Sequence, residues 1–210
     1  LKEIWNKNLL YKGFKIVPYC PRCGTPLSSQ EVAQGYKTVK ERSAVARFKV
    51  IGEDAYFLAW TTTPWTLASN VALCVGPKID YVAVETYNLY DGEPMTLIMA
   101  ESRLSAYLNL EQEVKEGELG DFDKDNKVCP WRIVDRIKGA ELEGLHYQQL
   151  MPWVKPCEKI GDFAAKFINE YAEKHADKVF TSEDGRDKFV EMDSEAFRVI
   201  LGDYVTTEDG

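Results

Sequence analysis

The sequence has no apolar run approaching the roughly 18 residues that a membrane-spanning helix requires. Its first residues, LKEIWNKNLLYKG, lack the uninterrupted apolar centre of a signal peptide. Repeats and low-complexity tracts are also missing, and the 45% hydrophobic, 12% aromatic and 29% charged residues lie near globular averages. We therefore expect a folded, cytoplasmic protein without a membrane partner.

Histidine and cysteine are scarce. Neither of the two histidines, His146 and His175, neighbours a candidate nucleophile, so no Ser-His-Asp or Cys-His arrangement is predicted. The five cysteines are an odd number and thinly spread, which argues against a disulfide scaffold.

Basic residues are concentrated in one part of the chain. The net charge is −8, yet residues 12–50 hold eight basic side chains against two acids, a local charge of +6. A protein binds nucleic acid non-specifically by neutralising its phosphates with basic side chains. The net negative charge of this chain therefore disfavours such binding. The basic residues at 12–50 form either a solvated face of the protein or a surface that guides the end of one nucleic-acid strand.

Short segments of strand character dominate after residue 31, and Asp91-Gly92 is a turn signal between two of them. This pattern predicts an α+β fold, a barrel-like domain with a few flanking helices. Helices are expected over residues 1–12, ending at Gly13, and over 162–175. Strands are expected at residues 46–50, 56–63, 71–75, 81–87, 95–100, 131–139 and 197–205.

The second of these helices is strongly amphipathic. Phe163, Phe167 and Tyr171 recur at helical spacing on one side, and Asp162 is positioned to cap its start. These aromatic side chains are expected to face the core.

A CxxC motif at Cys20 and Cys23 follows the first helix. Two thiolates separated by two residues can bind one metal from a tight turn, and Pro21 and Gly24 favour such a turn. The sequence contains no second CxxC, so the pair predicts half of a zinc site. A bare turn remains an alternative, and a redox role is disfavoured because Pro26 follows where a helix would begin.

The string WTTTPWTLASN, residues 60–70, is the most unusual in the chain. Its simplest interpretation is a β-branched strand that ends at a proline-containing turn. The functional interpretation is a pocket wall, because several hydroxyls and one amide gather where a strand gives way to a loop. Such a wall offers hydrogen-bond donors and acceptors but no strong base.

The same string resembles the threonine-rich peptide of the editing domain of isoleucyl-tRNA synthetases. VPYCPRCGTPLSSQEVAQGYK resembles the segment leading into that domain, and FRVILGDYVTTEDG resembles the strand leading to its second editing motif. Leucyl and valyl relatives carry Arg at the position of Thr63 and an acid at that of Trp65, so TTTPW favours the isoleucyl branch.

The resemblance implies hydrolytic proofreading, in which a second pocket cleaves the ester of a mischarged valyl-tRNA. Valine differs from isoleucine by one methylene, and the discrimination available from this difference is small. The implied catalytic residues are Thr61, Thr62 and Thr63. The implied substrate-binding residues are Trp65, Thr66 and Asn70, with Thr66 excluding the larger cognate side chain.

The resemblance also implies a longer parent enzyme that ligates isoleucine to tRNA, with ATP and magnesium used only in its catalytic core. Residues 1–30 are then a connecting helix and CxxC linker, and residues 31–210 an editing domain. The family's second motif continues past Glu-Asp-Gly to a His and an Asp, so we expect this domain to be truncated before that motif. The remaining zinc ligands are expected beyond the same point.

The expected partners are the tRNA 3′ end carrying a misacylated amino acid and the rest of the synthetase chain. Two alternatives stay open. One is an editing domain of the leucyl or valyl type. The other is a non-catalytic zinc-ribbon module that binds RNA or protein.

Overall fold

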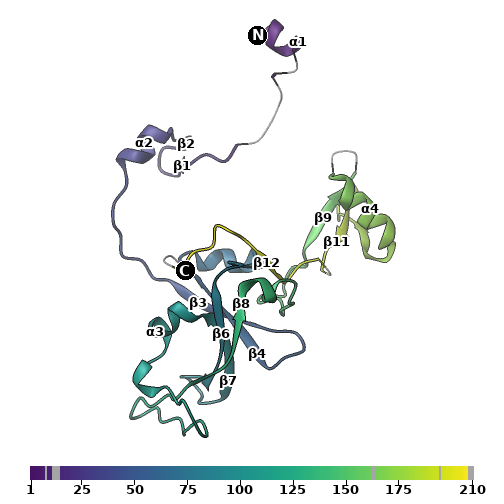
Figure 1. Ribbon diagram of the computed structural model, residues 1–210. Coiled ribbons are helices and arrows are strands. Elements are labelled where there is room, and N and C mark those ends of the chain that lie inside the picture. The colour runs from purple at the N-terminus through teal and green to yellow at the C-terminus, as the bar shows by residue number, and fades with distance from the viewer. Residues whose placement is uncertain (8, 11–14, 162–163, 194, 208–210) are drawn as a thin grey trace. The chain divides into compact units, whose positions relative to one another are not determined.

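The computed structural model divides into two compact units, Leu1–Glu41 and Arg42–Gly210 (Figure 1). It describes residues 1–7, 9–10, 15–161, 164–193 and 195–207.

The first unit contains short elements only. They are α1 (Lys2–Asn6), β1 (Tyr19–Cys20), β2 (Thr25–Pro26) and α2 (Ser29–Gln34). α1 ends well before residue 12, so the expected first helix is too long, and Gly13 lies outside the described residues. α2 begins with a capping box: Ser28 accepts the Glu31 backbone N–H, and Glu31 accepts the Ser28 backbone N–H.

The second unit is built on a five-stranded sheet in the order β3-β4-β7-β6-β8 (Figure 1). The expected strands and the turn at Asp91-Gly92 are confirmed, with Gly92 at φ 76° between two antiparallel strands. The sheet strands are β3 (Ala44–Lys49), β4 (Ala55–Thr61), β6 (Asp80–Tyr87), β7 (Pro94–Ala100) and β8 (Arg132–Lys138).

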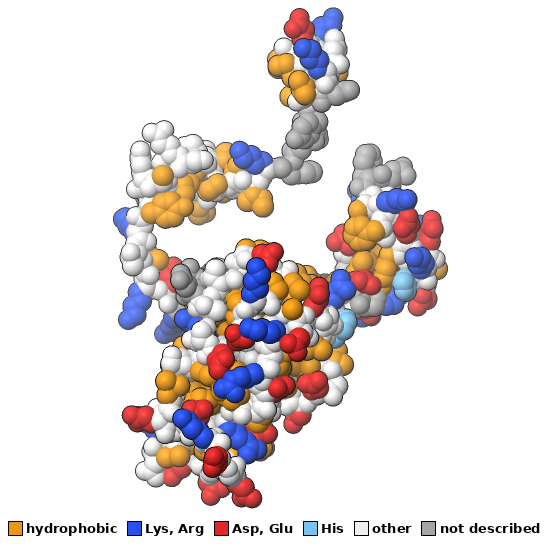
Figure 2. Space-filling model, viewed as in Figure 1, with side chains coloured by type: hydrophobic (Ala, Val, Ile, Leu, Met, Phe, Trp, Pro, Cys, Tyr) orange, Lys and Arg blue, Asp and Glu red, His pale blue; other side chains and the backbone are white. Residues whose placement is uncertain are grey.

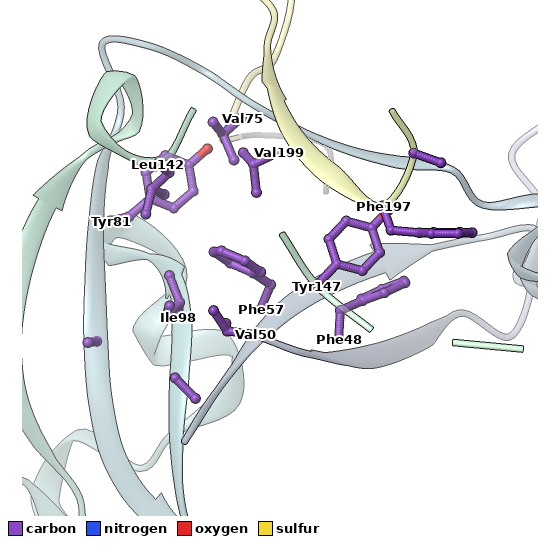
Figure 3. Close-up of a cluster of buried hydrophobic side chains, with 13 residues drawn as sticks. Phe48, Val50, Phe57, Val75, Tyr81, Ile98, Leu142, Tyr147, Phe197 and Val199 are labelled. Atoms are coloured by element: carbon purple, nitrogen blue, oxygen red, sulfur yellow. The ribbon is translucent and has the colours of Figure 1, made fainter. Parts of the chain in front are cut away.

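Both faces of this sheet are covered, because β6 is buried on each side. Tyr81 and Ala83 join one apolar cluster, and Val82 and Val84 join another. The first cluster, drawn in Figure 3, also receives Tyr147 from a loop. β6 is thus nearly continuous in apolar character, as expected for a strand covered on both faces.

The expected barrel does not close in the described part of the chain. β5 (Ala72–Val75) and β12 (Arg198–Leu201) form a separate parallel pair, so the expected strands at 71–75 and 197–205 are confirmed but lie outside the main sheet. β4 and β7 pair only over Ala55–Phe57, and the edges of the five-stranded sheet, β3 and β8, do not meet. The class is α+β with several open sheets.

A small sheet in the order β10-β11-β9 packs against α4 (Lys166–Lys174) and was not expected. α4 buries Ile168 and Ala172, whereas Phe167 is 63% exposed, so the expected apolar face is wrong for Phe167. Tyr171 packs against this cluster as expected. Asp162 and Phe163 lie outside the described residues. The three strands are β9 (Cys157–Ile160), β10 (Val179–Thr181) and β11 (Lys188–Glu191).

The remaining helices are short and lie in connections. No helix among the described residues is long and apolar enough to cross a membrane. On the visible face of the second unit, acidic and basic side chains are interspersed rather than gathered by sign (Figure 2). The short helices are η1 (Pro64–Ser69), η2 (Glu101–Arg103), α3 (Leu104–Tyr107), η3 (Leu110–Gln112), η4 (Gly139–Leu142) and η5 (Ala176–Lys178).

Candidate functional site

The threonine loop, residues 61–70, runs from the end of β4 through η1. β4 ends at Thr61, which pairs with Ala44 of β3. Pro64 then occupies the first position of η1, where its fixed φ suits a helical start and its missing N–H leaves no donor unpaired. The sequence therefore ends the strand and begins a helical turn within three residues.

Three of the predicted site residues share one chain of hydroxyls. The Oγ1 atoms of Thr61 and Thr63 are 3.3 Å apart, and those of Thr63 and Thr66 are 3.2 Å apart. The Thr63 backbone N–H donates to Thr61 Oγ1 at 3.0 Å, and the Thr66 hydroxyl donates to the Thr63 carbonyl oxygen at 2.7 Å. The loop geometry therefore depends on its own threonines.

Two more of the predicted site residues, Thr62 and Trp65, are exposed to solvent. Thr62 is exposed, which follows from its place between the part-buried Thr61 and Thr63. Trp65 is 72% exposed, and the other indole of the string, Trp60, is 38% exposed. Because they are not part of the core, Thr62 and Trp65 can contact a ligand without any change in core packing.

Asn70 closes the loop at its far end. Its backbone N–H donates to the Leu67 carbonyl oxygen at 3.2 Å, and its Nδ2 donates to the Ala72 carbonyl oxygen at 2.9 Å. Its Oδ1 accepts the hydroxyl of Tyr147 at 2.6 Å. Sequence reasoning missed Tyr147, because nothing local in the sequence links two residues 77 positions apart.

A cavity of about 620 Å³ lies next to the loop where β4 and β7 diverge. Its lining is largely apolar and includes Trp60, Tyr107 and the guanidinium-bearing Arg103. The loop's threonines do not line it, so Trp60 is the residue that the string and the cavity share. The hydroxyl chain and the hollow are thus neighbouring features rather than one pocket.

The chemistry that the loop can perform follows from its side chains. It contains hydroxyls, one amide and one indole, but neither carboxylate nor imidazole. Such groups can orient a water molecule and stabilise developing negative charge by hydrogen bonding. They cannot act as a strong general base at neutral pH.

The CxxC pair spans the turn between β1 and β2, with Cys20 at the end of β1 and Cys23 in the turn. The Cys23 backbone N–H donates to Cys20 Sγ at 3.4 Å, and this bond is the main reason that the pKa of the Cys20 thiol lies below its ordinary value. A thiolate is the form that binds zinc. Two thiols supply half of a four-ligand site, and the described residues bring no group of three or more potential ligands together.

Comparison with known proteins places the chain in a family. Residues 1–196 match the family model described as tRNA synthetases class I (I, L, M and V). The chain belongs to the class I tRNA synthetase family. Isoleucine–tRNA ligases are among the similar members of this synthetase family: that of Bacteroides thetaiotaomicron is 46% identical over the whole chain, that of Porphyromonas gingivalis 41%, and that of Clostridium acetobutylicum 42%.

The chain spans only a small part of these synthetases. It covers 17% of the Bacteroides thetaiotaomicron ligase, 16% of the Porphyromonas gingivalis ligase and 14% of the Clostridium acetobutylicum ligase. The expected resemblance to isoleucyl-tRNA synthetases is therefore confirmed at the level of family.

Proposed function

We propose that this chain is the editing module of an isoleucine–tRNA ligase and hydrolyses the ester of valyl-tRNA made in error. The observation that carries the proposal is the hydroxyl chain of Thr61, Thr63 and Thr66 at the end of β4. It presents hydrogen-bonding groups at a strand end beside two exposed indoles. The parent enzyme ligates isoleucine to tRNA, with ATP and magnesium used in a catalytic core outside this chain.

An aminoacyl ester is already activated, so the module needs to position a water molecule and stabilise an oxyanion. Thr61 and Thr63 hydrogen-bond one another and fix the loop, which leaves the exposed Thr62 hydroxyl available to the reacting ester. Trp65 is available to contact the terminal adenosine. Thr66 and Asn70 bound the space for the amino-acid side chain.

Two further assignments accompany this function. Cys20 and Cys23 form half of a zinc site whose other ligands belong to the parent synthetase, since two thiolates leave half of a tetrahedral shell to other donors. The partners are the misacylated 3′ end of tRNA and the remainder of the synthetase, in the cytoplasm.

The test is valyl-tRNA deacylation by the full-length synthetase carrying Thr62→Ala. Because Thr62 is exposed, the fold should survive its truncation, while the loss of one transition-state hydrogen bond slows hydrolysis about a hundredfold. Thr181→Ala, an exposed strand threonine in the small sheet, is the matched control and should leave deacylation unchanged.

Equal rates for the two variants would show that Thr62 takes no part in the reaction. Deacylation of mischarged leucyl- or valyl-specific tRNA in preference to the isoleucine tRNA would instead favour a different editing specificity. If the parent enzyme hydrolyses no aminoacyl-tRNA at all, the remaining alternative is a non-catalytic module that binds RNA or protein.

A further inference from the structure

One buried hydroxyl outside the threonine loop is bonded to the loop's last residue. The Tyr147 hydroxyl donates to Asn70 Oδ1 at 2.6 Å, and the same amide group donates from Nδ2 to the Ala72 carbonyl oxygen at 2.9 Å. Asn70 follows η1 directly and lies two residues before the start of β5. Its side chain is held from both sides.

Tyr147 itself cannot move easily. Its side chain is fully buried, and its ring packs edge-on against the rings of Phe48 and Phe197 (Figure 3). The ring centroids are 5.2 Å and 6.1 Å from that of Tyr147, respectively. Its backbone N–H donates to the Phe197 carbonyl oxygen at 2.8 Å, and a single β-bridge joins it to Val50. Ring and backbone are thus both fixed to the core.

The segment after the loop has a second attachment to the same place. The Phe197 backbone N–H donates to the Val71 carbonyl oxygen at 2.7 Å, and Phe197 adopts φ 57°, a left-handed conformation that is uncommon for a bulky residue. A backbone held in this conformation is maintained by its surroundings. Removing the Tyr147 hydroxyl therefore removes one of the two bonds that hold the Asn70 side chain while leaving the Val71 attachment in place.

We propose that Tyr147 is a positioning residue for the threonine loop and sets the orientation of its reactive hydroxyls through Asn70. The proposal rests on the editing function proposed above. Because Thr66 and Asn70 close successive turns of the same short helix, a displacement at Asn70 passes to Thr66 and then through the hydroxyl chain to Thr63. Catalysis is sensitive to displacements of this kind, and about 1 Å can cost a hundredfold in rate.

The matched control is a second buried tyrosine of the same apolar cluster. The Tyr81 hydroxyl accepts the Gly76 backbone N–H at 3.1 Å and has no bond to the loop. Tyr147→Phe and Tyr81→Phe each delete one buried hydroxyl with the ring retained. A purely structural role for Tyr147 predicts equal behaviour of the two variants.

The experiment uses the full-length synthetase and two readouts. Tyr147→Phe should lower kcat for valyl-tRNA deacylation about tenfold with KM nearly unchanged, and should speed amide hydrogen exchange in peptides covering residues 61–70. Tyr81→Phe should do neither. Exchange requires no hydrolysis, so it tests the Tyr147–Asn70 link even if the proposed function is wrong.

Equal loop exchange and equal kcat in the two variants would overturn the proposal. If Tyr147→Phe does not fold, Asn70→Ala removes the acceptor at a part-exposed position, together with the Nδ2 bond to Ala72, and should increase loop exchange at least as much. Unchanged exchange in Asn70→Ala would likewise overturn it. When both variants fold, the effect on kcat of the double variant should be less than the sum of the two single effects, because the Tyr147–Asn70 bond is lost in each of them.

Discussion

The role proposed for Thr66 has a steric part and a hydrogen-bonding part, and these can be tested separately because the hydroxyl and the methyl group can be removed one at a time. The Thr66 hydroxyl donates to the Thr63 carbonyl oxygen at 2.7 Å and lies 3.2 Å from the Thr63 hydroxyl. Its methyl group makes neither contact. Thr66→Val keeps the side-chain volume and removes the hydroxyl, whereas Thr66→Ser keeps the hydroxyl and removes the methyl.

If Thr66 excludes isoleucine by volume, Thr66→Ala admits a side chain larger by one methylene. Discrimination of one methylene is worth about 1–3 kcal/mol, so isoleucyl-tRNA hydrolysis should rise roughly 10- to 200-fold. Thr66→Val should keep the exclusion. Lost hydrogen bonding at this exposed position should cost about 1 kcal/mol or less, so thermal midpoints should fall by only a few degrees.

The assay is deacylation of purified isoleucyl- and valyl-tRNA by the full-length synthetase carrying each variant. Adenylate formation in the catalytic core serves as the internal control and should not change. The steric argument is refuted if Thr66→Ala leaves isoleucyl-tRNA intact. It is also refuted if Thr66→Val and Thr66→Ala slow valyl-tRNA hydrolysis alike while Thr66→Ser matches the parent, since Thr66 would then act through its hydroxyl.

Two further predictions concern metal and tRNA. After dialysis against a mild chelator, elemental analysis of this chain should find well under one zinc per molecule, because Cys20 and Cys23 provide only two ligands; stoichiometric zinc that Cys20→Ser removes would contradict the half-site. Charge reversal at Lys37, Lys40 and Arg47, all exposed, should weaken tRNA binding and flatten its salt dependence. An unchanged salt slope would place the phosphate contacts elsewhere.

The sequence was most informative where apolar periodicity was strong. Alternation around Phe48 predicted β3, and the strand expected at residues 81–87 is β6, which the structure buries on both faces. The strands β9, β10 and β11 were not predicted because each is only three or four residues long, and β9 and β11 also carry charged residues such as Lys159 and Glu191. The predicted apolar face of α4 was wrong at Phe167, because the helical spacing of large aromatic residues does not distinguish its side from that of Ile168 and Ala172, which the structure buries.

The candidate site likewise has one part that the sequence predicts and another that it does not. Its local part, the threonine string, is visible in the sequence because strand, proline and hydroxyls are contiguous. Its support is not visible in the sequence, because Tyr147 is held by tertiary packing against Phe197 and its bond to Asn70 joins distant positions. Barrel closure also depends on pairing between distant strands, and the short β4–β7 ladder could not be anticipated from either strand alone.

The buried tyrosines predict how the fold responds to alkaline solution. Burial raises the pKa of Tyr147 well above its ordinary value, and burial likewise raises the pKa of Tyr81. An unfolded tyrosine ionises near pH 10, so the unfolded chain releases protons that the folded chain retains. Stability from these groups is therefore complete below about pH 10 and is lost as pH rises toward the folded-state pKa, by up to about 1.4 kcal/mol per pH unit for each group.

Urea unfolding measured from pH 8 to 11 checks this sign. Tyr147→Phe should be less stable than the parent at pH 8 because Asn70 loses its donor, yet its stability should fall less steeply above pH 10. Lys49 and Lys178, whose pKa values are raised by their hydrogen bonds to Asp54 and Asp193, also lose stabilising charge in this range, so the difference between variants is the relevant quantity. Tyr90→Phe, at an 86% exposed ring, should follow the parent. Parallel curves for the parent and Tyr147→Phe above pH 10 would mean that the Tyr147 hydroxyl ionises without cost to the fold, and its bond to Asn70 would then contribute little to holding the loop.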